Sequence, residues 1–339
     1  GGSKSVFFAF CYRDDEVSDN GAFNAWLSSI AMFPMEAIKL ENMTADAVNN
    51  FVSDSLHLSP RITRPLSSVL YRKTGGNPLF LRQLMYSLNE QNHIRVQLNP
   101  PQWAWDLNKI IDLKISDDVV ALLLKDMQRL SDDLRLGLEV ASCFGSCVKC
   151  SVLDILSVDL KVNLQDVLQQ VSKRGLVDNV GGAMFRFAHD KIEQAAYDLM
   201  TEQKRRSNHM LFGLALCNHA LSGGADDDEL FFVAVNQMNR GGPETLTDPN
   251  QKNMVAKLNL KAGKRAIDLS DYNTAFQLFQ HGISFLGNDH WVDQYDLSLD
   301  LFDAAAEAAC VLNRLPEVNL YSKQMYDHAR CFDDKLNCK

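Results

Sequence analysis

Residues 184–200, MFRFAHDKIEQAAYDLM, place a short alternating apolar segment, a His189-Asp190 pair and an amphipathic segment in direct succession. The alternation in MFRF is typical of a half-buried strand, and the residues after Asp190 have the period of a helix. Upstream, LQDVLQQVSKRGLVDNV (residues 164–180) predicts a helix and a strand, and Gly181-Gly182 predicts a turn. With helices expected from Ser131 onward, residues 116–200 are predicted to form three helices closed by a two-stranded wing, a winged helix.

Two further helices are predicted on either side of TGGNPLFL, with the break at Gly75-Gly76. Asn77 can cap the second helix, and Pro78 fits its first turn because proline lacks an N–H that would have no partner there anyway. Residues 61–115 are therefore predicted to form a small helical domain. Ser116 and Ser131 are predicted caps of the helices that follow.

The first 60 residues alternate strand and helix signals. KSVFFAFCY (residues 4–12) predicts a buried strand, and a helix is expected over residues 20–31. A short strand is predicted at residues 37–40. Thr44 then caps a helix whose apolar face carries Val48, Phe51, Val52 and Leu56. This order is typical of an α/β domain.

Residues 201–339 are predicted to be helical throughout. Small residues at Gly263 and Ala275, with large ones at Tyr272, Phe279 and Leu286, allow two antiparallel helices to pack closely, which is similar to a tetratricopeptide repeat. A looser second unit follows, in which the run of residues 304–309 is rich in alanine. The array is expected to be truncated, since its end carries no obvious capping repeat.

The composition is that of an ordinary globular protein, and it weighs against nucleic acid and membrane lipid as partners. The 34 Lys and Arg against 43 Asp and Glu give a formal charge of -9, so no overall attraction to nucleic acid or anionic lipid is expected. No apolar run approaches the roughly 18 residues of a membrane-spanning helix. We therefore expect a cytoplasmic protein with no nucleic-acid and no membrane partner.

Three of the eight cysteines, Cys143, Cys147 and Cys150, are spaced closely enough to suggest a zinc site. No fourth Cys or His lies nearby in the sequence, and residues 143–150 are predicted to be a loop between two helices. Packed thiols are the preferred interpretation, so no metal site is predicted.

The order of FCYRDDEV, TGGNPLFL, WAWDLNKI and FRFAHDKIEQAAYDLM, followed by a helical tail, resembles the STAND-class signalling ATPases. The resemblance is strongest to the AAA-like module, of the Orc1-like type, in large multidomain histidine kinases and serine/threonine kinases. It spans nearly the whole chain. It implies a mainly α chain comprising the remnant of an α/β P-loop domain (1–60), a helical lid (61–115), a winged helix (116–200) and truncated TPR-like repeats (201–339). In that class, bound ADP holds the domains closed until an input permits exchange for ATP.

The same resemblance implies four nucleotide-binding residues. His189 would reach a phosphate, with Asp190 orienting its ring or capping the next helix; the alternative is an interface histidine beside a capping aspartate. Arg13 would pair with the terminal phosphate, or else is a surface arginine bound to neighbouring acids. Pro78 would pack on the adenine ring while Gly76, with its neighbour Gly75, allows close backbone approach; the alternative is a helix-starting proline without a ligand.

No GxxxxGK[ST] phosphate loop occurs in the sequence, and no apolar strand ending in paired acids for Mg²⁺ precedes residue 6. The chain alone is thus expected to have no catalytic residues and no ATPase activity. The predicted function is part of a nucleotide switch that uses ATP or ADP with Mg²⁺ in a longer parent, linking helical repeats that bind protein partners to an output kinase. The alternative is a scaffold of a winged helix and repeats that binds proteins without any nucleotide.

Overall fold

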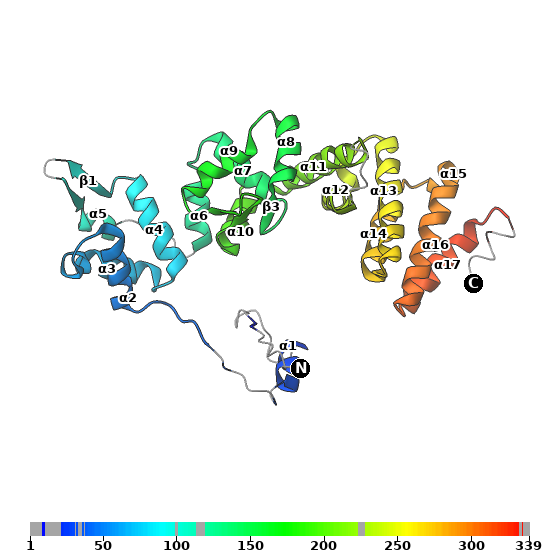
Figure 1. Ribbon diagram of the computed structural model, residues 1–339. Coiled ribbons are helices and arrows are strands. Elements are labelled where there is room, and N and C mark those ends of the chain that lie inside the picture. The colour runs from blue at the N-terminus through cyan, green and yellow to red at the C-terminus, as the bar shows by residue number, and fades with distance from the viewer. Residues whose placement is uncertain are drawn as a thin grey trace, which may run out of the picture.

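The computed structural model describes residues 9–10, 22–30, 32, 36, 38–98, 101–112, 119–222, 228–331 and 334. Within these residues the chain is mainly helical, as predicted, with strands in two small antiparallel sheets. Figure 1 shows three successive parts, which we call the first unit (45–112), the middle unit (119–200) and the helical array (202–328). They are preceded by α1 (Ala22–Ile30), within the helix predicted over residues 20–31.

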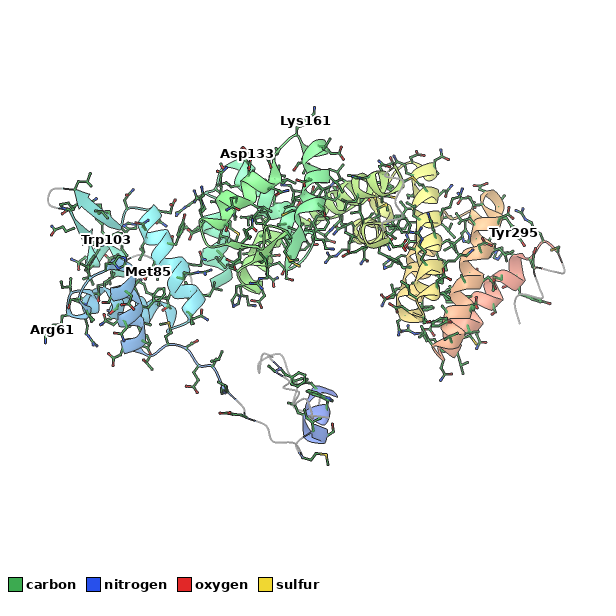
Figure 2. All side chains as sticks on the ribbon, in the orientation of Figure 1. Arg61, Met85, Trp103, Asp133, Lys161 and Tyr295 are labelled. Atoms are coloured by element: carbon green, nitrogen blue, oxygen red, sulfur yellow. The ribbon has the colours of Figure 1, made fainter. Side chains whose placement is uncertain are left out.

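The first unit is a group of helices with a hairpin. Its elements are α2 (Ala45–Leu56), α3 (Pro60–Thr74), α4 (Pro78–Glu90), β1 (Ile94–Leu98), β2 (Pro101–Trp105) and α5 (Leu107–Asp112). Thr44 caps α2 through its hydroxyl oxygen, and the predicted apolar face of α2 buries Val48 and Val52 completely. The predicted domain boundary between residues 60 and 61 falls in the first turn of α3, and the buried side chains of α2 and α3 share one core. Met85 and Trp103 mark this unit in Figure 2.

Residues 37–40 were predicted to form a strand. This prediction is wrong for residues 38–40, the described part of that range, which adopt no strand. Ile38 and Leu40 are 80% and 91% exposed. A strand needs a neighbouring strand to complete its backbone hydrogen bonds, and a short apolar pattern cannot establish that partner. Apart from residues 9 and 10, the strand predicted over 4–12 lies outside the described residues, as does the cap predicted at Ser116.

The middle unit combines helices with a three-stranded antiparallel sheet of order β3-β5-β4. Its elements are α6 (Val119–Met127), α7 (Asp132–Ser142), β3 (Cys147–Lys149), α8 (Cys150–Leu160), α9 (Leu164–Ser172), β4 (Val177–Val180), β5 (Met184–Phe187) and α10 (Asp190–Asp198). The predicted turn joins β4 to β5, with φ of 60° at Gly181 and 71° at Gly182, values that favour glycine. Ser131 precedes α7 as predicted, but its side chain makes no capping hydrogen bond.

The third strand, β3, was not predicted. Residues 143–150 were expected to be a loop, whereas Cys147–Lys149 pair with the edge of β5 that β4 leaves open. Val148 is buried between the exposed Cys147 and Lys149. Three residues are too few for a periodic signal, so this strand depends on its partner rather than on its own sequence.

The helical array consists of successive helices in hairpins. Its elements are α11 (Glu202–Ser222), α12 (Asp228–Gly241), the 3₁₀ helix η1 (Pro243–Thr245), α13 (Pro249–Asp268), α14 (Tyr272–Ser284), α15 (His290–Asp293), α16 (Tyr295–Val311) and α17 (Leu315–His328). The predicted small-to-large contact is present, because a Cβ at Gly263 would lie 2.2 Å from the ring of Phe279. Ala305, Ala308 and Ala309 are fully buried in the second predicted unit.

The middle unit and the array share one hydrophobic core, and a buried polar network crosses their joint. His209, only 1% exposed, contacts the Tyr197 hydroxyl through Nε2 (3.0 Å) and Gln237 Oε1 through Nδ1. Gln237 Nε2 and the Arg240 guanidinium both donate to Cys143 O at 3.0 Å. Since buried polar groups that are fully bonded stabilise a single arrangement, we treat the two parts as one body.

Candidate functional site

Three of the four residues that the resemblance assigned to nucleotide binding lie in two described places. Arg13 lies outside the described residues. Gly76 and Pro78 form the turn between α3 and α4 in the first unit, and His189 immediately precedes α10 in the middle unit.

The turn between α3 and α4 is built by local chemistry. Gly75 ends α3 in the left-handed conformation, with φ of 59°, and its N–H donates to Tyr71 O. The side chain of Asn77 accepts a hydrogen bond from Phe80 N at 3.0 Å, so Asn77 caps α4 as predicted. Pro78 then occupies the first turn of α4 and is exposed to solvent. An apolar ring is thereby available on the surface of the first unit.

Gly76 and Gly75 face different surroundings. A Cβ at Gly76, whose φ is 76°, would lie 2.1 Å from Met43 O, and Met43 N donates to Gly76 O at 2.9 Å. The residue preceding the α2 cap therefore fills the space beside Gly76. No heavy atom lies within 4 Å of a Cβ built on Gly75. Of the two glycines, Gly75 has the open side, and Gly76 serves a contact inside the first unit.

His189 is the residue that caps α10. Its backbone is extended, with φ of −162°, and Nδ1 accepts a hydrogen bond from Lys191 N at 3.1 Å. The cap had been predicted at Asp190, which instead is the first residue of the helix and also accepts from Lys191 N, at 2.7 Å. The shift by one residue follows from the strand, because Ala188 N still bonds to Leu176 O and leaves His189 as the extended residue before the helix.

The imidazole of His189 has one engaged edge. Nδ1 contacts both Lys191 N and the carboxylate of Asp190. When Nδ1 accepts from Lys191 N, a neutral imidazole carries its hydrogen on Nε2; when the ring is protonated, Nδ1 donates to the Asp190 carboxylate and Nε2 carries a hydrogen as well, so Nε2 can donate in either state. The side chain is 39% exposed. The Nε2 edge is thus the part of the ring that can meet a ligand, next to the N-terminus of a helix, where negative charge is favoured.

A short series of contacts connects the Pro78 turn to His189. Arg82 lies four residues after Pro78, on the same side of α4, and its guanidinium donates to Gly175 O at 2.7 Å. The next residue, Leu176, accepts the hydrogen bond from Ala188 N that precedes His189. A series of hydrogen bonds thus runs from α4 to the residue before His189, while Pro78 and His189 themselves lie in different units.

The interface between α4 and the middle unit, which we call the seam, joins two separate cores. Glu90 and Arg174 form an ion pair at 3.5 Å, and Ser87 Oγ donates to Asp126 at 3.1 Å. Burial raises the pKa of Asp126 above its usual value, although the bond from Ser87 opposes this. Most apolar residues of the first unit belong to a core distinct from that of the middle unit. Sequence reasoning missed the seam, because no local pattern marks Arg82 or Asp126 as interface residues.

The cysteines predicted to be packed thiols occupy different environments. Cys143 is buried, and burial raises the pKa of its thiol to about 12. Cys147 is exposed, and Cys150 contacts Gly182 O through sulfur at 3.4 Å. Over the part of the chain that the structure describes, no three His, Cys, Asp or Glu side chains gather as they would around a metal ion.

Within the described residues, no helix combines the length and the apolar character needed to cross a bilayer.

Comparisons with known proteins place the chain beside signalling kinases. No protein-family model matches it. It is 22% identical over 362 residues to "Hybrid signal transduction histidine kinase G" of Dictyostelium discoideum, covering 89% of this chain and 10% of that protein. It is 23% identical over 338 residues to "Peroxide stress-activated histidine kinase mak3" of Schizosaccharomyces pombe, covering 89% of this chain and 14% of that protein. The chain thus spans only a small part of these relatives.

One solved structure is similar over much of the chain. It is the crystal structure of a Signal Transduction ATPase with Numerous Domains (STAND) protein with a tetratricopeptide repeat sensor from Pyrococcus horikoshii. The sequence identity is 15%, the match covers 86% of this chain and 42% of that chain, and the TM-score is 0.35.

Proposed function

We propose that this chain is part of a STAND-type nucleotide-dependent conformational switch in a signalling protein. ADP or ATP, with Mg²⁺, would bind in the longer protein to which the chain belongs, and His189 would donate a hydrogen bond from Nε2 to a phosphate oxygen. The observation that carries the proposal is the environment of His189. Its Nδ1 edge is fixed by Lys191 and Asp190 while the ring stays partly exposed at a helix N-terminus.

The residues of the first unit fit the other end of a nucleotide. The exposed ring of Pro78 offers an apolar surface for a base, and the space where a side chain would stand at Gly75 is open. Arg82 joins this turn to the middle unit through Gly175 O. A ligand that contacts Pro78 and His189 together would therefore hold the seam closed, which is how a bound nucleotide can select one arrangement of two bodies.

The proposed assignment of units follows the same resemblance. The first unit would include the helical lid, the middle unit would be the winged helix, and the array would be TPR-like repeats that bind protein partners. The relatives are named as histidine kinases, which supports a role in signal transduction, with a kinase as the output domain. The cytoplasm is the proposed location. A scaffold that binds proteins without nucleotide is the competing function.

The test is a titration of fluorescent ADP into the longer protein, using variants that separate capping from phosphate contact. His189→Asp keeps a side chain that caps helices well but removes the donor and adds a negative charge, whereas His189→Asn keeps both a cap and an N–H donor. We expect ADP affinity to fall by roughly tenfold or more in His189→Asp, since a hydrogen bond to a charged group contributes about 1.5–3 kcal/mol. His189→Asn should retain most of the affinity.

His93→Ala, in the first unit, is the control for removal of a partly buried histidine that the proposal does not use. Equal ADP affinity in the natural protein, His189→Asp and His93→Ala would reject the phosphate contact. An absence of ADP binding by the natural protein would favour the scaffold.

A further inference from the structure

The seam contains a cavity that the proposed nucleotide contacts do not use. Its volume is about 340 Å³, within the size range of small-molecule sites. One wall is the side of α4 that carries Gln83, Ser87 and Glu90, and the opposite wall comes from α6, the start of α7 and the turn before β4. Pro78 does not line the cavity, and Arg82 lies next to it, one turn before the lining residue Tyr86. The cavity is therefore shared by two units and begins one turn beyond the Pro78 turn.

The floor of the cavity is apolar. Its side chains come from the middle unit: Leu123, Met127, Leu130, Leu134 and Leu176. Leu123 and Met127 are each only 1% exposed, so this surface is part of a packed core and is preformed. Leu123 and Met127 have little surface left to shield, so the area that an apolar occupant would remove from water comes mainly from the partly exposed Leu130, and the gain is proportional to that area.

The cavity is also lined by two acidic and two basic side chains, which form two ion pairs. Arg174 lies 3.5 Å from Glu90, and Arg129 lies 3.7 Å from Asp126. Both distances exceed those of direct charge-assisted hydrogen bonds, which are about 2.7–2.9 Å. The guanidinium groups thus retain N–H donors, and the carboxylates retain lone pairs, that a ligand of suitable charge can use.

Each of the two ion pairs meets α4, and the two points of contact are neighbours on that helix. Ser87 donates to Asp126, while Glu90, three residues later, pairs with Arg174. Residues three apart on a helix lie about 5–6 Å from each other between Cβ atoms. The negative and positive groups therefore bracket one small volume above the apolar floor.

This pattern selects one class of ligand by charge. A phosphate or a dicarboxylate could pair with Arg129 and Arg174 but would bring like charge against Asp126 and Glu90, and a diamine could pair with the acids but would face the two arginines. A molecule with one charge of each sign satisfies both kinds of group. We propose that the cavity binds a small zwitterion with an apolar body, of the α-amino-acid class, whose ammonium group contacts Asp126 and whose carboxylate contacts Arg174.

Asp126 is suited to receive a cation. Its side chain is 27% exposed, and its pKa is raised chiefly by burial. An ammonium group at this carboxylate compensates the lost hydration and lowers the pKa again. Binding of the zwitterion should therefore strengthen as the pH rises from acid values through the pKa of Asp126, where the carboxylate becomes charged.

The experiment is isothermal titration calorimetry of the full chain with L-leucine and L-phenylalanine. Two analogues of leucine carry one charge each: isopentylamine has the ammonium group, and 4-methylpentanoate has the carboxylate. We expect saturable binding of at least one amino acid and binding of both analogues that is at least about tenfold weaker, because each lacks one charge-assisted contact. The measurement needs no nucleotide, so its outcome is independent of the role of His189.

Matched substitutions locate the site. Asp126→Asn and Arg174→Gln should each weaken binding by about tenfold, whereas Asp159→Asn on α8 and Arg186→Gln on β5, both exposed in the same unit, should leave it unchanged. Ser131→Trp, at the rim of the cavity, should block binding without removing a capping bond. Circular dichroism verifies that each variant is folded.

Three results would overturn the proposal. The first is no saturable heat with either amino acid. The second is equal affinity for leucine and one of its singly charged analogues, which would reject the zwitterion. The third is unchanged affinity in any folded variant among Asp126→Asn, Arg174→Gln and Ser131→Trp, which would place the ligand elsewhere.

Discussion

Replacing Gly76 with alanine should loosen the first unit far more than the same change at Gly75. Both glycines have positive φ, of 76° and 59°, so alanine at either position bears a left-handed backbone strain of about 1–2 kcal/mol. Only Gly76 adds a collision, because its Cβ would lie 2.1 Å from Met43 O. Gly75 has open space and is the matched control.

The extra cost at Gly76 has two parts. Moving Met43 away weakens the hydrogen bond from Met43 N to Gly76 O, which contributes about 0.5–1.5 kcal/mol. Crowding in a packed interior adds about 1–3 kcal/mol. The two contributions sum to about 1.5–4.5 kcal/mol, so we expect Gly76→Ala to destabilise the first unit by about 3 kcal/mol more than Gly75→Ala, the middle of that range. At 1.36 kcal/mol per factor of ten, the difference in opening equilibrium is roughly 150-fold.

Amide hydrogen exchange followed by mass spectrometry measures the opening of the first unit peptide by peptide. Peptides from α3 and α4 should exchange faster in Gly76→Ala by that factor, while peptides from α13 and α14 stay unchanged and serve as an internal control. Equal exchange in the two variants would refute the conclusion that Gly76 is required by Met43.

Three further outcomes follow from buried groups and close contacts. Burial lowers the pKa of His209 in the folded chain, so the free energy of unfolding should fall as the pH drops below about 6.5, the pKa of a histidine in the unfolded chain. Urea denaturation at pH 7 and pH 5 measures this loss, and His209→Gln should reduce it. Iodoacetamide at pH 8 should modify the exposed Cys147 in the folded chain but reach Cys143 only after denaturation, as peptide mass spectrometry can show. Gly263→Ala should cost about 1–3 kcal/mol of unfolding free energy, while Gly287→Ala, with no atom near its Cβ, should change it by less than about 0.5 kcal/mol.

The parts of the fold that sequence reasoning predicted depend on residues close in the chain. Asn77 and Pro78 predicted the start of α4 because capping and the proline first turn are local rules. Gly263 and Phe279 predicted a close helix pair since small and large residues recur at helical spacing. In these cases the physical cause lies within a few residues of the signal or in a repeated pattern.

The parts that were missed depend on distant partners. β3 exists because β5 has an edge to pair with, and three residues of sequence carry no trace of that edge. The bond from Arg82 to Gly175 joins residues 93 apart, and nothing near Arg82 distinguishes it from any exposed helical arginine. The cap of α10 was displaced by one residue for the same reason, because the bond from Ala188 to Leu176 determines where the strand ends.

The arrangement of α4 connects the two proposed sites and allows them to be tested together. The first turns of this helix carry Pro78 and Arg82, and its later turns carry Ser87 and Glu90, which line the cavity. The middle unit and the array share one hydrophobic core, whereas the first unit has its own, so the seam at α4 is where we expect the described units to separate. A ligand at either end of α4 favours the closed seam if it contacts both units.

If both proposals hold, leucine and ADP should therefore strengthen each other's binding. Linkage requires the two factors to be equal, since each ligand reports the same coupling free energy. The measurement is the affinity of the longer protein for fluorescent ADP with and without saturating leucine, repeated with Arg174→Gln. We expect leucine to raise ADP affinity in the natural protein and to have no effect in Arg174→Gln. An increase that persists in Arg174→Gln would show that leucine acts away from the seam, and no increase in the natural protein would show that the two ends of α4 respond independently.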